Sequence, residues 1–344
     1  AQLRQAINSS ARFLAGRYQA YEQGNGLMNV GAAWDLLRTN IKTNEILSFV
    51  EVNTILSDFL AIPGVGVGIN DREGVSVGAA YTREYTFLRN VGPGGTKTYN
   101  LSWVGNDGTF SAAGSIALPK GVPVTLNVPI IPATPGAHSA ILNLDDPATA
   151  GIEYQTMNVV VAADQFTAPD YSATKTGSLG PGQFVSHYFN VPAGTPAFKV
   201  DMTGGGAPGA GAIRFLRWHP YGLGVDSNAV SSCYNSTGTF TCSTGSPTSR
   251  TVSNPQAGVW EVTVDARRNS DAVSAPFTLS ASILGATVSP NPDVIASATI
   301  GVPIARSYDI TNLYGAFTGR AVGTGLGSAY VATPSIANHA QQQY

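Results

Sequence analysis

Charged residues are scarce in this sequence, and their scarcity excludes several classes of protein. Asp, Glu, Lys and Arg make up 12% of the 344 residues, and the formal net charge is −2. No basic cluster exceeds the pair Arg267-Arg268, so the cationic surface that binds nucleic acid is missing. No apolar run approaches the roughly 18 residues of a membrane-spanning helix. The sequence therefore predicts no nucleic-acid partner and no membrane span.

Cysteine and histidine are also rare, with 2 and 4 residues. Cys233 and Cys242 are separated by eight residues, which excludes the Cys-x-x-Cys spacing of redox and zinc sites. The histidines are scattered, so we expect no metal site and no cofactor. We expect a disulfide bond between the two cysteines, with two free thiols as the alternative. A disulfide and Ser/Thr/Gly-rich loops favour a secreted, extracellular protein.

The abundant residue types are those of a turn-rich β protein. The chain holds 39 Gly and 21 Pro, and its 43% of hydrophobic residues is too high for a disordered chain. Apolar and polar residues alternate with a period of two along several short stretches between turn residues, which is typical of half-buried strands. Examples are Tyr99 to Trp103, Val122 to Ile130 and Ala140 to Leu144. We predict a sandwich of immunoglobulin or fibronectin type III kind over residues 58–165.

A second series of strands predicts another sandwich over residues 166–285. The stretches from Tyr188 to Gly194 and from Gly258 to Asp265 resemble the jelly-roll modules of pre-peptidase C-terminal type, which are attached to secreted bacterial peptidases. A third β segment starts near Val288 and has too few strands for a complete domain. We therefore expect residues 286–344 to form an incomplete third β domain.

The first forty residues have a different pattern, with helical periodicity. One apolar stripe consists of Leu3, Ile7, Ala11 and Leu14. The apolar stripe of a second helix consists of Val30, Ala33, Trp34 and Leu37. Between them, Gly24 and Gly26 supply the backbone of a turn and Asn29 can cap the second helix. We expect two helices, 3–14 and 30–37, joined by a tight turn.

This opening resembles the closing segment of the catalytic domain of the subtilisin-like serine proteases, the subtilases. Arg4-Gln-Ala-Ile-Asn-Ser-Ser-Ala11 and Gly24-Asn-Gly-Leu-Met-Asn-Val-Gly-Ala-Ala33 match two family motifs that follow the helix of the nucleophilic serine. The resemblance implies a structural role for Gly24, Gly26, Asn29 and Ala33. The catalytic aspartate, histidine and Gly-Thr-Ser-Met-Ala turn of the family are absent, so no residue here inherits a catalytic role. We therefore expect residues 1–45 to end a catalytic domain, with a connector at 46–57.

Several motifs that suggest chemistry have a simpler structural interpretation. Gly74-Val-Ser76-Val-Gly78 matches the serine turn of α/β-hydrolases, but a strand follows it where that motif needs a helix. Gly64-Val-Gly-Val-Gly68 lacks the third glycine of a dinucleotide site. Asp145-Asp146, followed by a proline, predicts a turn rather than a calcium site. Candidate general bases by residue type alone are His138, His187, His219 and His339. Trp103, Trp218 and Trp260 are expected in the core.

Together these features predict an accessory region of a secreted serine peptidase, itself without catalytic activity. The implied partner is an N-terminal protease domain, whose substrate is a protein or peptide. The rival hypothesis is an extracellular adhesin or carbohydrate-binding array. The two hypotheses differ in whether residues 1–40 have a core of their own, because two short helices cannot bury both stripes alone.

Overall fold

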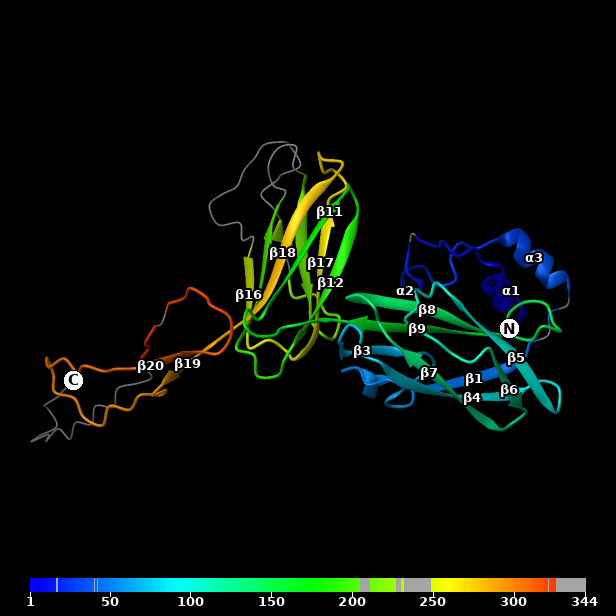
Figure 1. Ribbon diagram of the computed structural model, residues 1–344, viewed down its shortest axis with the longest axis horizontal. Coiled ribbons are helices and arrows are strands. Elements are labelled where there is room, and N and C mark those ends of the chain that lie inside the picture. The colour runs from blue at the N-terminus through cyan, green and yellow to red at the C-terminus, as the bar shows by residue number, and fades with distance from the viewer. Residues whose placement is uncertain are drawn as a thin grey trace, which may run out of the picture.

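The computed structural model describes residues 1–16, 18–39, 41, 43–204, 211–226, 230–231, 249–320 and 322–325. Within these ranges the chain starts with short helices and continues as two β-sandwiches and a two-stranded ribbon (Figure 1). The expected fold class, mostly β sandwiches after a helical start, is confirmed. No helix in the described ranges is long and apolar enough to cross a membrane.

The opening segment, residues 1–39, contains α1 (Gln2–Ser10), α2 (Ala20–Gln23) and α3 (Val30–Arg38). The first helix is shorter than its apolar stripe predicts, because the chain becomes extended at Ala11. Beyond it, the backbone of Arg12 exchanges two hydrogen bonds with Leu27, of 2.8 and 2.9 Å. A long-range backbone pairing thus replaces the helical turn that would have reached Leu14.

The first sandwich is built from two sheets with strand orders β2-β1-β4-β7 and β3-β9-β8-β5-β6. The strands are β1 (Glu45–Glu51), β2 (Val65–Gly66), β3 (Asn70–Val75), β4 (Tyr81–Val91), β5 (Thr96–Val104), β6 (Ser115–Pro119), β7 (Pro123–Ile130), β8 (Gly136–Asp145) and β9 (Tyr154–Ala162). Strand β1 lies upstream of residue 58, where the sandwich was expected to begin. Its inward positions are Ile46, Ser48 and Val50, and the polar Ser48 hides the apolar alternation.

The second sandwich has the strand orders β10-β12-β17-β14-β15 and β11-β18-β13-β16. Its strands are β10 (Asp164–Gln165), β11 (Ser172–Leu179), β12 (Phe184–Val191), β13 (Ala197–Thr203), β14 (Ile213–Trp218), β15 (Val230–Ser231), β16 (Ser249–Ser253), β17 (Gly258–Ala266) and β18 (Ala275–Leu284). Strand β10 follows β9 after one residue and pairs in parallel with β12. The connection between the sandwiches is therefore itself part of a sheet.

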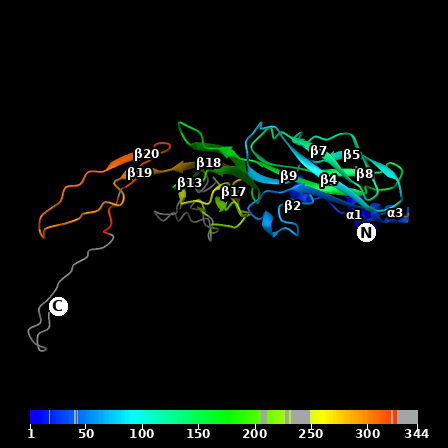
Figure 2. The ribbon, with the colours of Figure 1, turned by 90° about the horizontal axis from the view of Figure 1, so that it is seen from below.

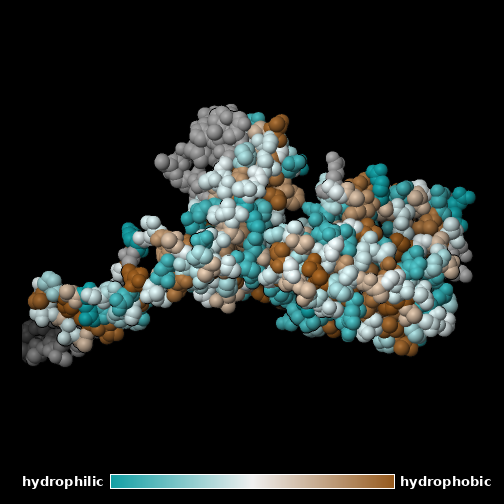
Figure 3. Space-filling model, viewed as in Figure 1, coloured by the Kyte–Doolittle hydropathy of each residue, from teal (hydrophilic) through white to brown (hydrophobic). Residues whose placement is uncertain are grey.

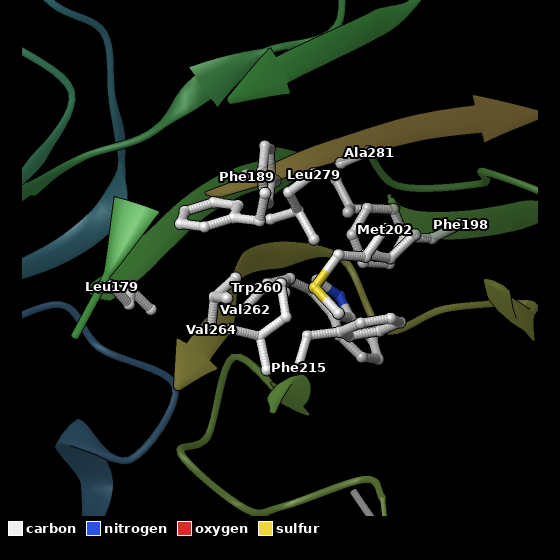
Figure 4. Close-up of a cluster of buried hydrophobic side chains, with 14 of the residues drawn as sticks. Leu179, Phe189, Phe198, Met202, Phe215, Trp260, Val262, Val264, Leu279 and Ala281 are labelled. Atoms are coloured by element: carbon white, nitrogen blue, oxygen red, sulfur yellow. The ribbon is translucent and has the colours of Figure 1, made fainter. Parts of the chain in front are cut away.

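The core of the second sandwich is aromatic. Phe189, Phe198, Phe215 and Trp260 are all fully buried and come from both sheets, and Figure 4 shows them converging on the space between those sheets. The indole Nε1 of Trp260 donates to the carbonyl of Gln256 at 2.7 Å, which satisfies the polar atom of this core side chain. Of the three tryptophans expected in the core, Trp260 is fully buried, whereas Trp103 and Trp218 are half-buried.

A third segment follows, in which β19 (Ala286–Ser289) pairs with β20 (Asp309–Asn312). Every residue of both strands is exposed, and Figure 3 shows hydrophobic residues at the surface of this segment. Tyr314 ties the segment to the second sandwich, because its ring packs edge-on against Tyr171 with the centroids 5.2 Å apart. That residues 286–344 form an incomplete third β domain stays a prediction.

Candidate functional site: the opening helices and the junction beneath them

The opening segment lies on the first sandwich, over the sheet that contains β8 and β9 (Figure 1). The backbone N–H of Ile152 donates to Ser9 Oγ at 2.9 Å, and that of Tyr21 donates to Ser139 Oγ at 3.1 Å. Helices α1 and α3 pack on each other through a small apolar cluster. Its members are Ala6, Ala33 and Ile41, joined by the partly buried Ile7, Leu36 and Leu37.

The turn before α3 is shaped by the residues of the subtilase-like motif. Gly26 has a φ of +98°, and a Cβ atom there would lie 2.2 Å from the carbonyl oxygen of Arg12. Glycine is therefore required at this close approach of two backbones. Asn29 caps α3, since its side-chain oxygen accepts a hydrogen bond from the N–H of Ala32 at 3.1 Å. Gly24 adopts a positive φ and Ala33 lies in the helix–helix contact. All four residues shape the backbone, and none presents a reactive group.

A large part of the apolar surface of the opening segment has no cover in the described part of the chain. We call this surface the opening apolar face. It consists of Leu3 (60% exposed), Leu27 (49%), Met28 (63%), Val30 (65%) and Trp34 (62%). Three members of the two predicted apolar stripes, Leu3, Val30 and Trp34, thus lie mainly in solvent. Exposed apolar side chains gathered in one place mark an interaction surface.

Beneath α2, the opening segment and both sandwiches meet at Tyr188 of β12, which is 5% exposed. The hydroxyls of Tyr21 and Tyr188 lie close enough to affect each other's pKa. Arg72 of β3 stacks on the Tyr188 ring, with 5.5 Å between its Cζ and the ring centroid, and donates to Glu261 of β17 at 3.1 Å. We call these four residues the junction. Desolvation and the negative charge of Glu261 raise the pKa of Tyr188, so its hydroxyl stays protonated.

A second set of contacts continues the junction along the linker. Gln165 donates to the carbonyl of Gly74 at 3.2 Å and accepts from the amide of Asn190 at 2.9 Å. Val161, Ala163 and Val259 form an apolar cluster around Tyr188. Buried contacts of this kind restrict the motion of one sandwich relative to the other.

We expect Arg72→Ala to loosen the junction without unfolding either sandwich. The variant removes one ion pair and one cation–π contact, a loss of about 1–3 kcal/mol. Pulsed electron–electron double resonance measures the distance between two spin labels, one in β5 and one in β18. The distance distribution should be broader in Arg72→Ala than in the unsubstituted protein. Lys199→Ala, which removes a surface ion pair within the second sandwich, is the control and should leave the distribution unchanged. An unchanged distribution in Arg72→Ala would show that the linker alone fixes the arrangement.

His138 is the one candidate base that contacts a carboxylate in the described part of the chain, and its geometry is structural. Its Nδ1 lies 2.6 Å from Asp107 Oδ2 and its Nε2 lies 2.7 Å from the carbonyl oxygen of Thr134. Both ring nitrogens are thus engaged, one by the carboxylate and one by the carbonyl oxygen, and neither is free to act as a general base. Burial alone would raise the pKa of Asp107, but hydrogen bonds from His138 and Thr109 outweigh it and lower that pKa. With His138 only 3% exposed, this pair holds a loop in place.

The other candidate motifs are turns. Ser76 lies between β3 and β4 with no helix after it, as the sequence predicts. Asp146 Oδ2 accepts from Lys97 Nζ at 2.8 Å and its Oδ1 accepts from the N–H of Ala148 at 3.1 Å, which occupies both oxygens in a turn. The described residues contain no group of three or more side chains arranged to hold a metal ion. Cys233, Cys242 and His339 lie outside the described residues, so the disulfide stays a prediction.

His187 is half-buried in β12, and its Nε2 has no hydrogen-bond partner in the described structure. Burial, with the nearby Lys175 as a lesser cause, lowers the pKa of His187 to about 4. The unfolded chain, with an ordinary histidine pKa, therefore takes up a proton at a higher pH than the folded one. The contribution of His187 to the free energy of unfolding is therefore fully present above about pH 6.5 and is lost as the pH falls toward 4.

We expect His187→Gln to flatten part of this pH dependence. The histidine contributes at most about 3 kcal/mol between pH 7 and pH 4, and less because the ring is partly solvated. Urea unfolding of both proteins between pH 7 and pH 4.5 measures the difference. Parallel curves for the two proteins would show that the ring titrates normally in the folded state.

Sequence reasoning missed the junction and an ion cluster in the second sandwich. Asp226, whose side chain is 1% exposed, accepts from Arg217 Nη2 at 2.8 Å and from Arg250 Nη1 at 3.2 Å. Arg217 stands on β14 and Arg250 on β16, so the carboxylate bridges the two sheets. These residues are far apart in the sequence and follow no motif, so no signal in the chain marks them.

The first sandwich is similar to a class of Ig-like domain that accompanies serine proteases. Residues 49–162 match the family model described as "Ig-like domain in actinomycete serine proteases". Among curated proteins, the chain is similar to pyrolysin of Pyrococcus furiosus, with 25% identity over 216 residues, which covers 58% of this chain and 15% of pyrolysin. Among solved structures, it is similar to tripeptidyl peptidase 2 (TPP II), with 16% identity and a TM-score of 0.59. That match covers 83% of this chain and 24% of the TPP II chain, and it shows a shared fold. The chain thus spans a small part of each protein.

Proposed function

We propose that this chain is the C-terminal accessory region of an extracellular subtilisin-like serine peptidase. The parent protein hydrolyses peptide bonds with a catalytic domain that precedes Ala1, and this chain contributes no catalytic residue. Its role is to support that domain, shape substrate access or mediate assembly. The observation that carries the proposal is the opening apolar face, which directly precedes a domain of the kind found in actinomycete serine proteases.

The opening apolar face fits the surface of a helix pair that has been separated from its core. Leu3, Met28, Val30 and Trp34 are each at least 60% exposed, although α3 is capped by Asn29. Burying such side chains contributes about 25 cal/mol per Å² of apolar area. A catalytic domain that covers them would gain several kcal/mol from this face alone. The resemblance of residues 4–11 and 24–33 to the end of a subtilase domain supports that partner.

The remaining divisions belong to the same proposal. Residues 1–45 complete the catalytic domain, the Ig-like sandwich of 58–165 also includes β1 (Glu45–Glu51), 166–285 form a pre-peptidase-type sandwich and 286–344 begin a third domain. Helix α2 contacts Ser139 of the first sandwich and lies near Tyr188 of the second, so a catalytic domain on the opening segment would lie close to both. Secretion is inferred from the serine-protease family match and from the expected disulfide.

Amide hydrogen exchange tests the proposal directly. In the 344-residue chain, residues 2–10 and 30–38 should exchange faster than strands β5 and β17, because part of their packing is missing. In the polypeptide produced from the whole coding sequence, the two helices should become about tenfold or more better protected, while the strands stay unchanged. Trp34→Ser should weaken that protection, whereas Val273→Ser, a change at an even more exposed position of the second sandwich, should not.

Two results would contradict the proposal. One is a pair of helices that are as well protected in the 344-residue chain as the strands of both sandwiches. The other is a coding sequence upstream of Ala1 without the Gly-Thr-Ser-Met-Ala turn, for example one that encodes further sandwiches. The latter would favour the adhesin hypothesis.

A further inference from the structure

One end of the second sandwich contains a groove with unpaired positive charge. The groove has a volume of about 430 Å³ and lies between the turn before β12 and the turn after β17. We call it the basic groove. Its charged and aromatic lining residues are Phe184, Arg214, Asp265, Arg267 and Arg268. Three guanidinium groups and one carboxylate therefore line the same groove, which leaves an excess of positive charge.

Arg267 and Arg268 have no carboxylate partner among the side chains of this chain. The second sandwich contains seven basic residues, and five of them form ion pairs: Lys175, Lys199, Arg214, Arg217 and Arg250. Every Asp and Glu of the chain belongs to the described residues, and none of them forms an ion pair with Arg267 or Arg268. The charge of both guanidinium groups is therefore available to an anion from outside the chain.

The backbone on both sides of the basic groove is fixed by hydrogen bonds to neighbouring strands. The N–H of Arg267 donates to the carbonyl of Ala212 at 2.9 Å, and the N–H of Ser270 donates to the carbonyl of Arg267 at 3.0 Å. In the opposite turn, the N–H of Gly182 donates to the carbonyl of Ala266 at 2.9 Å. Both turns are therefore ordered before a ligand arrives, which lowers the entropy cost of binding.

Strand pairing adds an exposed ring and further donors to the basic groove. Asp265 of β17 pairs with Phe184 of β12 on one side and with Arg214 of β14 on the other. Side chains of directly paired residues lie on the same face of a sheet. Arg214 donates to Asp265 through Nε at 2.7 Å, and its two Nη atoms make no hydrogen bond within the described part of the chain. Phe184 is 59% exposed, so an apolar surface lies beside these donors.

These groups fit an acidic protein segment in which carboxylates flank an apolar side chain. A guanidinium group can hold a carboxylate by two parallel hydrogen bonds, and an exposed phenylalanine ring packs well against another apolar side chain. Nucleic acid carries a charge on every nucleotide and is bound by longer tracts of basic residues. A neutral ligand would leave the unpaired charge of Arg267 and Arg268 unused.

The basic groove lies away from the opening apolar face. Figure 2 shows the second sandwich between the first sandwich and the ribbon of β19 and β20. In Figure 1 the turn between β17 and β18 lies at the end of the second sandwich that points away from both. We propose that the basic groove binds an acidic segment of the protein substrate, with carboxylates on Arg267 and Arg268 and an apolar side chain on Phe184. That the bound protein is a substrate rests on the proposed function.

Isothermal titration calorimetry of the 344-residue chain tests the groove without a catalytic domain. The probe is the peptide acetyl-Gly-Glu-Phe-Glu-Gly-amide, and the control is its uncharged counterpart acetyl-Gly-Gln-Phe-Gln-Gly-amide. The charged peptide should bind about tenfold or more tightly than the control, because only its carboxylates pair with the arginines. Arg268→Gln and Phe184→Ser should each weaken this binding about fivefold or more. Lys120→Gln removes the same charge from an exposed position of the first sandwich and should leave the binding unchanged. Urea unfolding of each variant checks that it is folded.

The calorimetry alone can overturn the inference while the proposed function stands. Equal affinities for the charged and uncharged peptides would do so, and so would an unchanged affinity in a folded Arg268→Gln variant. Binding of polygalacturonate that is lost in Arg268→Gln, with no binding of the acidic peptide, would assign the groove to an acidic polysaccharide instead.

The role in substrate binding is tested in the polypeptide from the whole coding sequence. A model protein substrate is prepared with and without the sequence Gly-Glu-Phe-Glu-Gly at one terminus. The added sequence should raise kcat/KM about threefold or more in the unsubstituted polypeptide and in Lys120→Gln, but not in Arg268→Gln. No gain in the unsubstituted polypeptide would show that the groove does not bind substrate. Peptide binding to a chain whose opening helices are fully protected on their own would retain the acidic-peptide site but overturn both the proposed function and the substrate role.

Discussion

Replacement of Asp226 by asparagine is expected to destabilise the second sandwich by about 3–5 kcal/mol. The amide keeps the shape of the side chain but removes the negative charge of Asp226 that pairs with Arg217, whose side chain is 5% exposed. Arg217 donates to Asp226 through Nε at 3.1 Å and through Nη2 at 2.8 Å, so the pair is bidentate. Without this carboxylate, the buried guanidinium of Arg217 has neither water nor a counter-charge to offset its desolvation. Urea unfolding followed by circular dichroism measures the loss.

Two further variants make the Asp226 result specific. Asp201→Asn removes a carboxylate from an ion pair on the surface of the same sandwich and should cost less than about 1 kcal/mol. The double variant Arg217→Met, Asp226→Leu replaces the buried pair by apolar side chains and should recover much of the stability lost in Asp226→Asn. A loss below about 1 kcal/mol in Asp226→Asn would mean that water reaches the cluster and that it does not clamp the two sheets.

Trp260→Ala is expected to cost about 3–5 kcal/mol, the second large effect in this chain. The indole is fully buried, packs on Phe198 with ring centroids 5.3 Å apart and lies 4.8 Å from the ring of His219. Its removal leaves a cavity between two sheets that are held by strand pairing and cannot collapse to fill it. Thermal unfolding followed by near-ultraviolet circular dichroism reports the change.

The matched variant is Trp34→Ala in the opening apolar face. Because Trp34 is 62% exposed, its loss should change the stability of the 344-residue chain by no more than about 0.5 kcal/mol. The contrast between the two tryptophans separates a core role from a docking role.

The same pair of variants also tests the carbohydrate-binding hypothesis. A Trp260→Ala protein that keeps its stability but loses binding to a polysaccharide would favour that hypothesis over the accessory role proposed here.

The opening helices show how far a pattern of apolar residues can be trusted. The stripe from Val30 to Leu37 predicts α3 well, and the Asn29 cap lies where the residue type suggests. The first stripe extends to Leu14, yet α1 ends at Ser10, because the backbone of Arg12 pairs with Leu27. A hydrogen bond between residues fifteen positions apart leaves no periodic trace in the sequence. Such long-range backbone pairings limit how accurately a local pattern of apolar residues predicts where a helix ends.

The sequence by itself determined the class of fold. Alternation of period two defines strands such as β5 and β17, because each residue in a sheet faces one side or the other. The missing Gly-Thr-Ser-Met-Ala turn can also be read directly from the residues. The match of residues 49–162 to the Ig-like domain of serine proteases agrees with the predicted fold class.

Only the tertiary structure decided which side chains meet and which stay uncovered. The contact between Arg72 and Glu261 joins residues 189 positions apart, and Trp34 is 62% exposed although it belongs to the apolar stripe of α3. Burial depends on what the rest of the chain places over a residue, and contact depends on how sheets stack. Neither quantity is a property of a local stretch of sequence, so the junction and the opening apolar face became visible only in the folded molecule.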